Sequence, residues 1–205
     1  MRRTKHRDQT ARGPAGIELA GALGLLAAIL WMTPAFALVP PTSVDQTSAS
    51  FLHHLLSMAN TVFHEAGHVI LSPFGRFLTV LGGSLLQVVV PVVAGFALWR
   101  SGSVVGPPFA LWWAGQSAAS VARYVADAQG GRLMLLGGVT GRDAPGTHDW
   151  RNLLTWTGLL EWDVQLGWIV HSVGSLAMAV GLVWLAWLCW QGVLGWLAGA
   201  EQQAP

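Results

Sequence analysis

The chain has 205 residues, of which 53% are hydrophobic and only 10% charged, and its formal net charge is +1. This balance excludes a nucleic-acid-binding surface, which needs a marked excess of basic residues. Several apolar runs approach the ~20 residues that a helix needs to cross a bilayer. The composition therefore predicts an all-α, polytopic membrane protein. The single cysteine, Cys189, cannot form an intramolecular disulfide, and we interpret it as a buried thiol.

The chain divides into a basic cytoplasmic tail at 1–16, a single transmembrane bundle domain at 17–199 and a second tail at 200–205. We predict about five transmembrane helices and one short interfacial helix. The predicted spans are 19–39, 51–71, 77–99, 109–127 and 164–198, and the interfacial helix is 150–160. The last segment is about twice as long as one span requires. It is either one long helix bent at a glycine or a span with an interfacial extension.

The first apolar segment has a second interpretation. It follows a basic region and contains Ala35-Phe36-Ala37, so residues 1–37 also fit a cleaved signal peptide with an A-x-A site. The apolar run is long for a signal peptide, which favours an uncleaved transmembrane helix.

The positive charges predict the orientation of the spans. If the N-terminal tail lies inside and the spans alternate, every lysine and arginine except Arg100 lies on or near the inner face. Cytoplasmic segments of membrane proteins carry such an excess of Lys and Arg. We therefore predict an integral protein of the bacterial cytoplasmic membrane with its N-terminus inside.

The second predicted span contains the pattern H-E-x-x-H, formed by His64, Glu65 and His68. Two histidines four positions apart lie on one face of a helix and can bind the same metal ion. A glutamate beside the first histidine is placed to take a proton from the water that the metal activates. Polar groups inside an apolar span are costly unless they have a function. The pattern therefore predicts a zinc site.

Other polar residues extend this face along the same segment. At 100° per residue, a set of polar positions falls within about 80° of arc. These positions are His53, Ser57, Asn60, His64 and His68. The stripe predicts a hydrated cleft that brings water to the metal, or alternatively hydrogen bonds to neighbouring spans. The second interpretation is favoured for His53 and His54, because His53 lies ~16 Å along the helix from His64.

A catalytic zinc usually has three protein ligands, so the two histidines need a partner. The predicted topology places Asp127, His148 and Asp149 on the same membrane face as the histidines, and His171 lies in the last span. Asp127 ranks first, because a charge at the end of an apolar helix is costly. Its alternative role is an ion pair with Arg123, four positions earlier.

Asp149 ranks closely behind Asp127 as the third ligand. It precedes a predicted helix, so its alternative role is that of an N-cap. The neighbouring His148 makes a purely structural role less favourable. For His171, a hydrogen bond within the core is the preferred interpretation.

The six residues 63–68 within an apolar span resemble the site-2 protease clan of intramembrane zinc metallopeptidases, as does the order of the spans. The chain is most similar to the small bacterial members of that clan. The resemblance implies that His64 and His68 bind Zn²⁺, that Glu65 is the general base and that an aspartate from a later span completes the site. It further implies hydrolysis of a membrane-protein or peptide substrate in or beside the bilayer.

Two other functions stay open at this point. The protein is alternatively a non-catalytic or degenerate peptidase-like protein with a structural or transport-related metal site, or a metal-dependent hydrolase that acts on lipid. A closed set of four ligands, such as His64, His68, Asp127 and Asp149 together, would favour the non-catalytic alternative. An open fourth position that faces a cleft would favour an enzyme.

Overall fold

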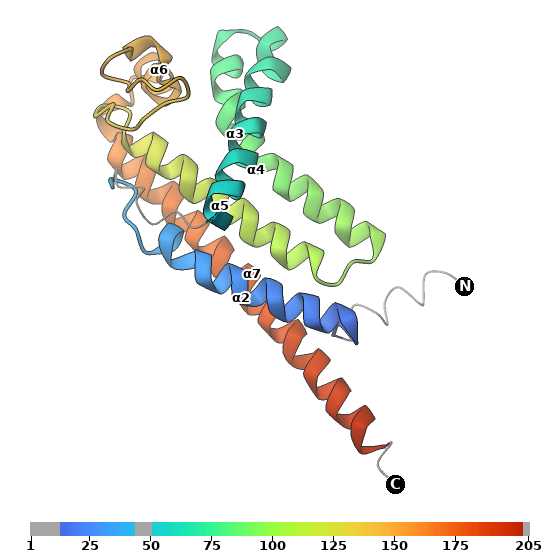
Figure 1. Ribbon diagram of the computed structural model, residues 1–205. Coiled ribbons are helices and arrows are strands. Elements are labelled where there is room, and N and C mark those ends of the chain that lie inside the picture. The colour runs from blue at the N-terminus through green and yellow to red at the C-terminus, as the bar shows by residue number, and fades with distance from the viewer. Residues whose placement is uncertain (1–12, 44–50, 203–205) are drawn as a thin grey trace.

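The computed structural model describes residues 13–43 and 51–202, and this part of the chain is all-α, without a β-strand. Its helices are α2 (Ile17–Ala37), α3 (Phe51–Leu71), α4 (Arg76–Ser101), α5 (Gly106–Ala126), α6 (Asp149–Thr157) and α7 (Asp163–Glu201) (Figure 1). The all-α prediction is confirmed, and each predicted segment corresponds to one helix. Most of the predicted basic tail, 1–12, and the end of the predicted C-terminal tail, 203–205, lie outside the described residues.

Three helical segments are long and apolar enough to cross a membrane, namely Ile17–Ala37, Arg76–Ser101 and Leu160–Ala200. α3 and α5 have the same length as α2, 21 residues, but they are more polar. For α5 the reason is its position, because twelve of its residues are buried. A side chain that faces other helices does not need to match the lipid.

α5 packs antiparallel on α7 through glycines of α7 that are seven residues apart. A Cβ at Gly174 would lie 2.7 Å from the carbonyl oxygen of Gly115, and a Cβ at Gly181 would lie 2.7 Å from that of Pro108. Only glycine therefore allows the two backbones to come this close. α7 is a single helix of 39 residues, and its C-terminal end extends beyond the other helices (Figure 1).

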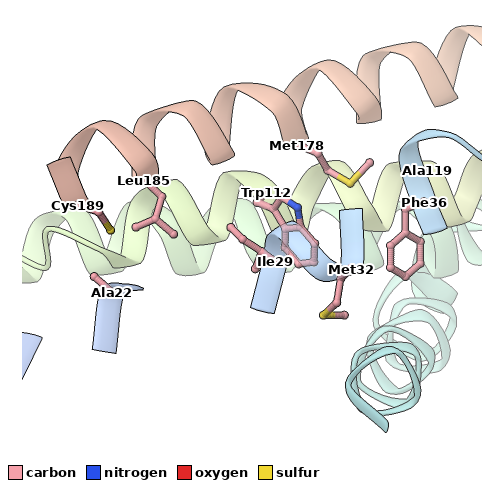
Figure 2. Packing of buried hydrophobic residues seen from close by; sticks show 9 residues of the cluster. All are labelled: Ala22, Ile29, Met32, Phe36, Trp112, Ala119, Met178, Leu185 and Cys189. Carbon is pink, nitrogen blue, oxygen red and sulfur yellow. The ribbon is translucent and has the colours of Figure 1, made fainter. Parts of the chain in front are cut away.

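The main hydrophobic core lies between α2, α5 and α7 (Figure 2). Trp112 of α5 is 1% exposed, and its indole N–H donates a 2.8 Å hydrogen bond to Oγ1 of Thr33 on α2. The other buried members of this core are Ala22, Ile29, Met32, Phe36, Ala119, Met178, Leu185 and Cys189. The predicted burial of Cys189 is confirmed. This core fixes the position of α5, which forms one wall of the site described below.

α3 and α4 form a hairpin joined by the short turn Ser72–Phe74. The two helices come closest where Gly67 meets Gly82, because a Cβ on either glycine would collide with the carbonyl group of the other. Gly67 lies inside the H-E-x-x-H pattern, so this glycine brings α4 directly against the turn that carries the histidines. Further along, α4 contains Pro91 and changes direction (Figure 1), as expected of a helix with an internal proline.

Candidate metal centre

The two histidines of the pattern converge on one carboxylate oxygen. Nε2 of His64 lies 3.0 Å from Oδ2 of Asp149, and Nε2 of His68 lies 3.3 Å from the same oxygen. The two imidazole rings meet edge to face, with centroids 4.9 Å apart. In a tetrahedral zinc site with bonds of about 2.0–2.1 Å, neighbouring donor atoms are about 3.3 Å apart. Each histidine nitrogen therefore lies at nearly the distance from the Asp149 oxygen that two ligands of one zinc ion have.

Hydrogen bonds at the far side of each ring orient its Nε2 atom toward this point. Nδ1 of His68 lies 2.8 Å from the carbonyl oxygen of Thr79, which can only accept, so this nitrogen carries the proton. Nδ1 of His64 lies 3.3 Å from Oε1 of Gln87. The amide of Gln87 is oriented by its own N–H, which donates to the carbonyl of Ser117 at 3.5 Å. A neutral imidazole whose proton lies on Nδ1 presents Nε2 as its metal-binding atom.

The N-cap of α6 is His148 rather than Asp149. Nδ1 of His148 accepts a hydrogen bond of 3.2 Å from the backbone N–H of Arg151. The His148 ring is fully buried, and burial lowers its pKa, so it stays neutral and able to accept. The capping role predicted as an alternative for Asp149 is thus taken by its neighbour. The Asp149 carboxylate is left to face the histidines.

Two further contacts hold the start of α6 against the rest of the site. The backbone N–H of Asp149 donates to the hydroxyl of Tyr124 on α5 at 2.9 Å. The indole N–H of Trp150 donates to Oγ of Ser84 on α4 at 2.9 Å. Asp149 is therefore tied to both helices that flank the histidines, although it is remote from them in sequence.

Glu65 completes the cluster on the open side. One possible donor atom from each of His64, Glu65 and His68 lies within 4.8 Å of those of the other two residues. The Glu65 side chain is exposed and borders a cavity of about 790 Å³ that also reaches both histidines and Asp149. A group in this place can exchange protons with water or with a molecule that enters the cavity.

Asp127, the first-ranked prediction for the third metal ligand, has other partners. Its buried carboxylate accepts a 2.7 Å hydrogen bond from the backbone N–H of Leu133 and forms a 3.5 Å salt bridge with Arg132. The predicted alternative, an ion pair with Arg123, is not among the salt bridges of the described residues. The structure thus brings Asp149, and not Asp127, to the two histidines. Asp127 instead organises the loop that follows α5.

His171, the remaining candidate, belongs to the core. Its Nε2 lies 3.1 Å from the carbonyl oxygen of Ala37, and its ring packs against that of Trp168. This placement agrees with the core hydrogen bond that the sequence favoured for it.

The polar stripe of α3 has both of the predicted roles. Asn60 is buried and joins α3 to α5: its amide donates to Gln116 at 2.9 Å and accepts from the indole of Trp113 at 3.0 Å. Ser57 and the two motif histidines line the cavity. His53 is buried, stacks on Phe36 with ring centroids 5.3 Å apart and also borders the cavity.

Sequence reasoning did not single out Gly83 or Tyr124 as parts of the site. A Cβ at Gly83 would lie 2.6 Å from Nε2 of His64 and 2.7 Å from Nε2 of His68. Glycine at this position of α4 thus leaves room for the Nε2 edges of both rings. The signal in the sequence is the run of small residues 82–84, which is typical of close helix packing.

Comparison with family models, curated proteins and solved structures gives no match for this chain. The class of the site therefore rests on its own geometry and chemistry.

Proposed function

We propose that the protein is a zinc-dependent intramembrane metallopeptidase that hydrolyses peptide bonds in or near the bilayer. The observation that carries this proposal is the convergence of His64, His68 and Asp149 beside Glu65, at the wall of an open cavity. Two neutral imidazoles and one carboxylate form a ligand set that catalytic zinc ions use.

Each residue then has a distinct task. His64, His68 and Asp149 hold the zinc ion, which, when bound, supplies a Lewis acid that polarises a peptide carbonyl and activates water. Glu65 accepts the proton of the attacking water and returns it to the amine that leaves. Asp127 is bonded elsewhere and adds no fourth ligand. Three protein ligands beside a cavity support a catalytic site over a closed structural one.

The proposed membrane arrangement has five spanning helices, α2, α3, α4, α5 and α7, with the N-terminus inside a bacterial cytoplasmic membrane. α3 and α5, at 21 residues each, are about 31 Å long, enough for a hydrocarbon core of ~30 Å. The side of α3 away from the cavity exposes apolar side chains, including Met58 and Val62, which suit contact with lipid. The distribution of Lys and Arg supports the orientation.

The site resembles that of the site-2 protease clan, in which an H-E-x-x-H helix meets an aspartate from a later segment. In this chain the aspartate is Asp149, at the start of the short helix α6. The substrate is then a membrane protein or a peptide that enters from the bilayer or its surface.

The zinc content of the purified protein tests the first step of this proposal. We expect about one zinc ion per chain in the unchanged protein and a loss of most of this zinc in His64→Ala, because one of three ligands is removed. His54→Ala is the matched control, since His54 lies exposed on the same helix. Metal analysis of detergent-purified protein gives the ratio. Equal zinc contents in His64→Ala and His54→Ala would reject the site.

The glycine beneath the ring nitrogens provides a second test. We expect Gly83→Ala to weaken zinc binding by about 10- to 100-fold, as other changes to groups that orient metal ligands do. The added methyl displaces both imidazole edges, which move more easily than backbone. Competition with a zinc chelator measures the affinity. Gly24→Ala is the control, because a Cβ there meets no atom within 4 Å, and an unchanged affinity in Gly83→Ala would contradict the site geometry.

A further inference from the structure

We infer that Arg123 binds a carboxylate of the peptide substrate and thereby selects substrates with a negative charge close to the bond that is cleaved. This inference rests on the proposed peptidase function, because it assigns the cavity to a peptide. It adds a recognition group to the site and defines the chemical class of the preferred substrate.

Arg123 lines the cavity that also reaches the proposed metal site, formed by His64, His68 and Asp149 beside Glu65. Along α5, the residues that border this cavity are Gln116, Ser120, Val121, Arg123 and Tyr124. Tyr124, the next residue, binds the backbone N–H of the proposed ligand Asp149. Arg123 is also the only lysine or arginine among the described residues that line the cavity.

No carboxylate of the described chain neutralises this guanidinium. The salt bridges in that part of the structure pair Asp127 with Arg132, while Asp149 lies against the two histidines. The Arg123 guanidinium lies over the ring of Phe36, with Cζ 5.8 Å from the ring centroid. Arg123 lies in the last turn of α5 and is only partly exposed. A charged side chain among apolar helices is costly, and such residues usually serve a ligand, an ion or a partner.

The chemistry of the guanidinium defines what it binds. Its planar group of donors matches a carboxylate, which it can bind with two parallel hydrogen bonds. Contact with the Phe36 ring uses one face of the group and leaves the N–H edges available. The same cavity reaches Glu65 and the proposed metal site. A carboxylate bound by Arg123 therefore belongs to the same molecule as the peptide bond that is cleaved at the metal site. Its source is either an acidic side chain or a free C-terminus.

Binding to a catalytically inactive protein tests the inference without requiring cleavage. The probe is one apolar peptide of twelve residues, of fixed sequence and fluorescently labelled, in three forms. The first is neutral with an amidated C-terminus, the second carries one central glutamate with the amidated end, and the third is neutral with a free C-terminus. Each form is titrated into zinc-loaded Glu65→Gln protein in detergent. The same titrations are made with Arg123→Gln, Arg123→Lys or Arg100→Gln added.

We expect one carboxylate-bearing form to bind about 10- to 100-fold more tightly than the neutral form, which corresponds to a hydrogen bond with a charged group. The form that gains shows whether the carboxylate comes from a side chain or a C-terminus. Arg123→Gln should abolish the preference while zinc content is unchanged. Arg123→Lys should retain part of it, because the charge stays but the paired donors are lost. Arg100→Gln, exposed at the far end of α4, should change nothing.

Equal binding of all three forms would overturn the inference, and so would a preference that survives Arg123→Gln. Competition by phosphatidylglycerol that depends on Arg123, with no discrimination among the peptides, would assign the arginine to lipid and also overturn it. The proposed function can fail separately. A carboxylate preference that depends on Arg123, in a protein whose unchanged form cleaves none of these peptides, supports the recognition role and counts against the peptidase.

Discussion

Glu65→Gln is expected to lower the rate of peptide cleavage by about 10²- to 10⁴-fold, the usual contribution of a general base, while the zinc content stays the same. Glutamine has nearly the shape of glutamate but cannot accept a proton at neutral pH. Glu65 is exposed at the cavity and is not part of the buried core, so the change should leave the fold intact. The separation of metal binding from cleavage is what distinguishes a base from a ligand.

The measurement compares cleavage of a transmembrane peptide in proteoliposomes with metal analysis of the same preparations. Glu161→Gln is the matched control, because Glu161 is exposed in the short turn before α7. Loss of zinc in Glu65→Gln would make Glu65 a ligand. Cleavage at an unchanged rate would remove Glu65 from the reaction. Zinc binding by an unchanged protein that cleaves no peptide would support the non-catalytic alternative.

The helices could be predicted from sequence because their signals are local. Apolar runs that approach membrane length predicted each of the long helices, and α6 was predicted separately as a short interfacial helix. The positions of these helices relative to one another could not be read in this way. No pattern in the 21 residues of α5 predicts that this helix lies at the centre of the bundle. Its close contacts with the glycines of α7 depend on the sequences of both helices. A bend at a glycine was one of the two predictions for the last segment, whereas Gly167, Gly174 and Gly181 of α7 are points of close contact with α5.

The candidate site likewise has one part that the sequence predicts and another part that depends on how the helices pack. The spacing of His64, Glu65 and His68 places them together through helix geometry alone. The groups that orient the rings, Thr79 and Gln87, come from α4, so they follow from the packing of the hairpin. No local pattern in the sequence connects Gln87 with His64.

The choice of the carboxylate that would be the third ligand shows most clearly what the sequence could not predict. Asp127 and Asp149 both belong to the same predicted membrane face, so topology does not separate them. The loop between the two residues determines which carboxylate reaches the histidines. At the start of this loop, Asp127 accepts a hydrogen bond from the N–H of Leu133. At the end of the loop, His148 caps α6. Only the folded loop shows which of the two carboxylates is left for the histidines.

A pair of conservative changes tests this assignment: Asp149→Asn is expected to weaken zinc binding by more than about 100-fold, and Asp127→Asn should leave it unchanged. The reference for this magnitude is the 10- to 100-fold effect of groups that merely orient ligands, which a ligand itself should exceed. An amide oxygen carries no net charge and binds zinc poorly compared with a carboxylate. Asp127→Asn keeps an oxygen that can accept from the N–H of Leu133, so the loop should keep its shape.

Both changes replace one oxygen by an NH₂ group and remove one negative charge, so they differ only in position. Each purified variant is titrated with a zinc chelator, and circular dichroism checks that its helix content is unchanged. Asp149 is tied to α5 and α4 through its own backbone and through Trp150, so the start of α6 should stay in place when the carboxylate is altered. A zinc affinity that falls in Asp127→Asn and persists in Asp149→Asn would reverse the assignment. An equal loss in both variants would show that the loop, rather than one carboxylate, controls the site.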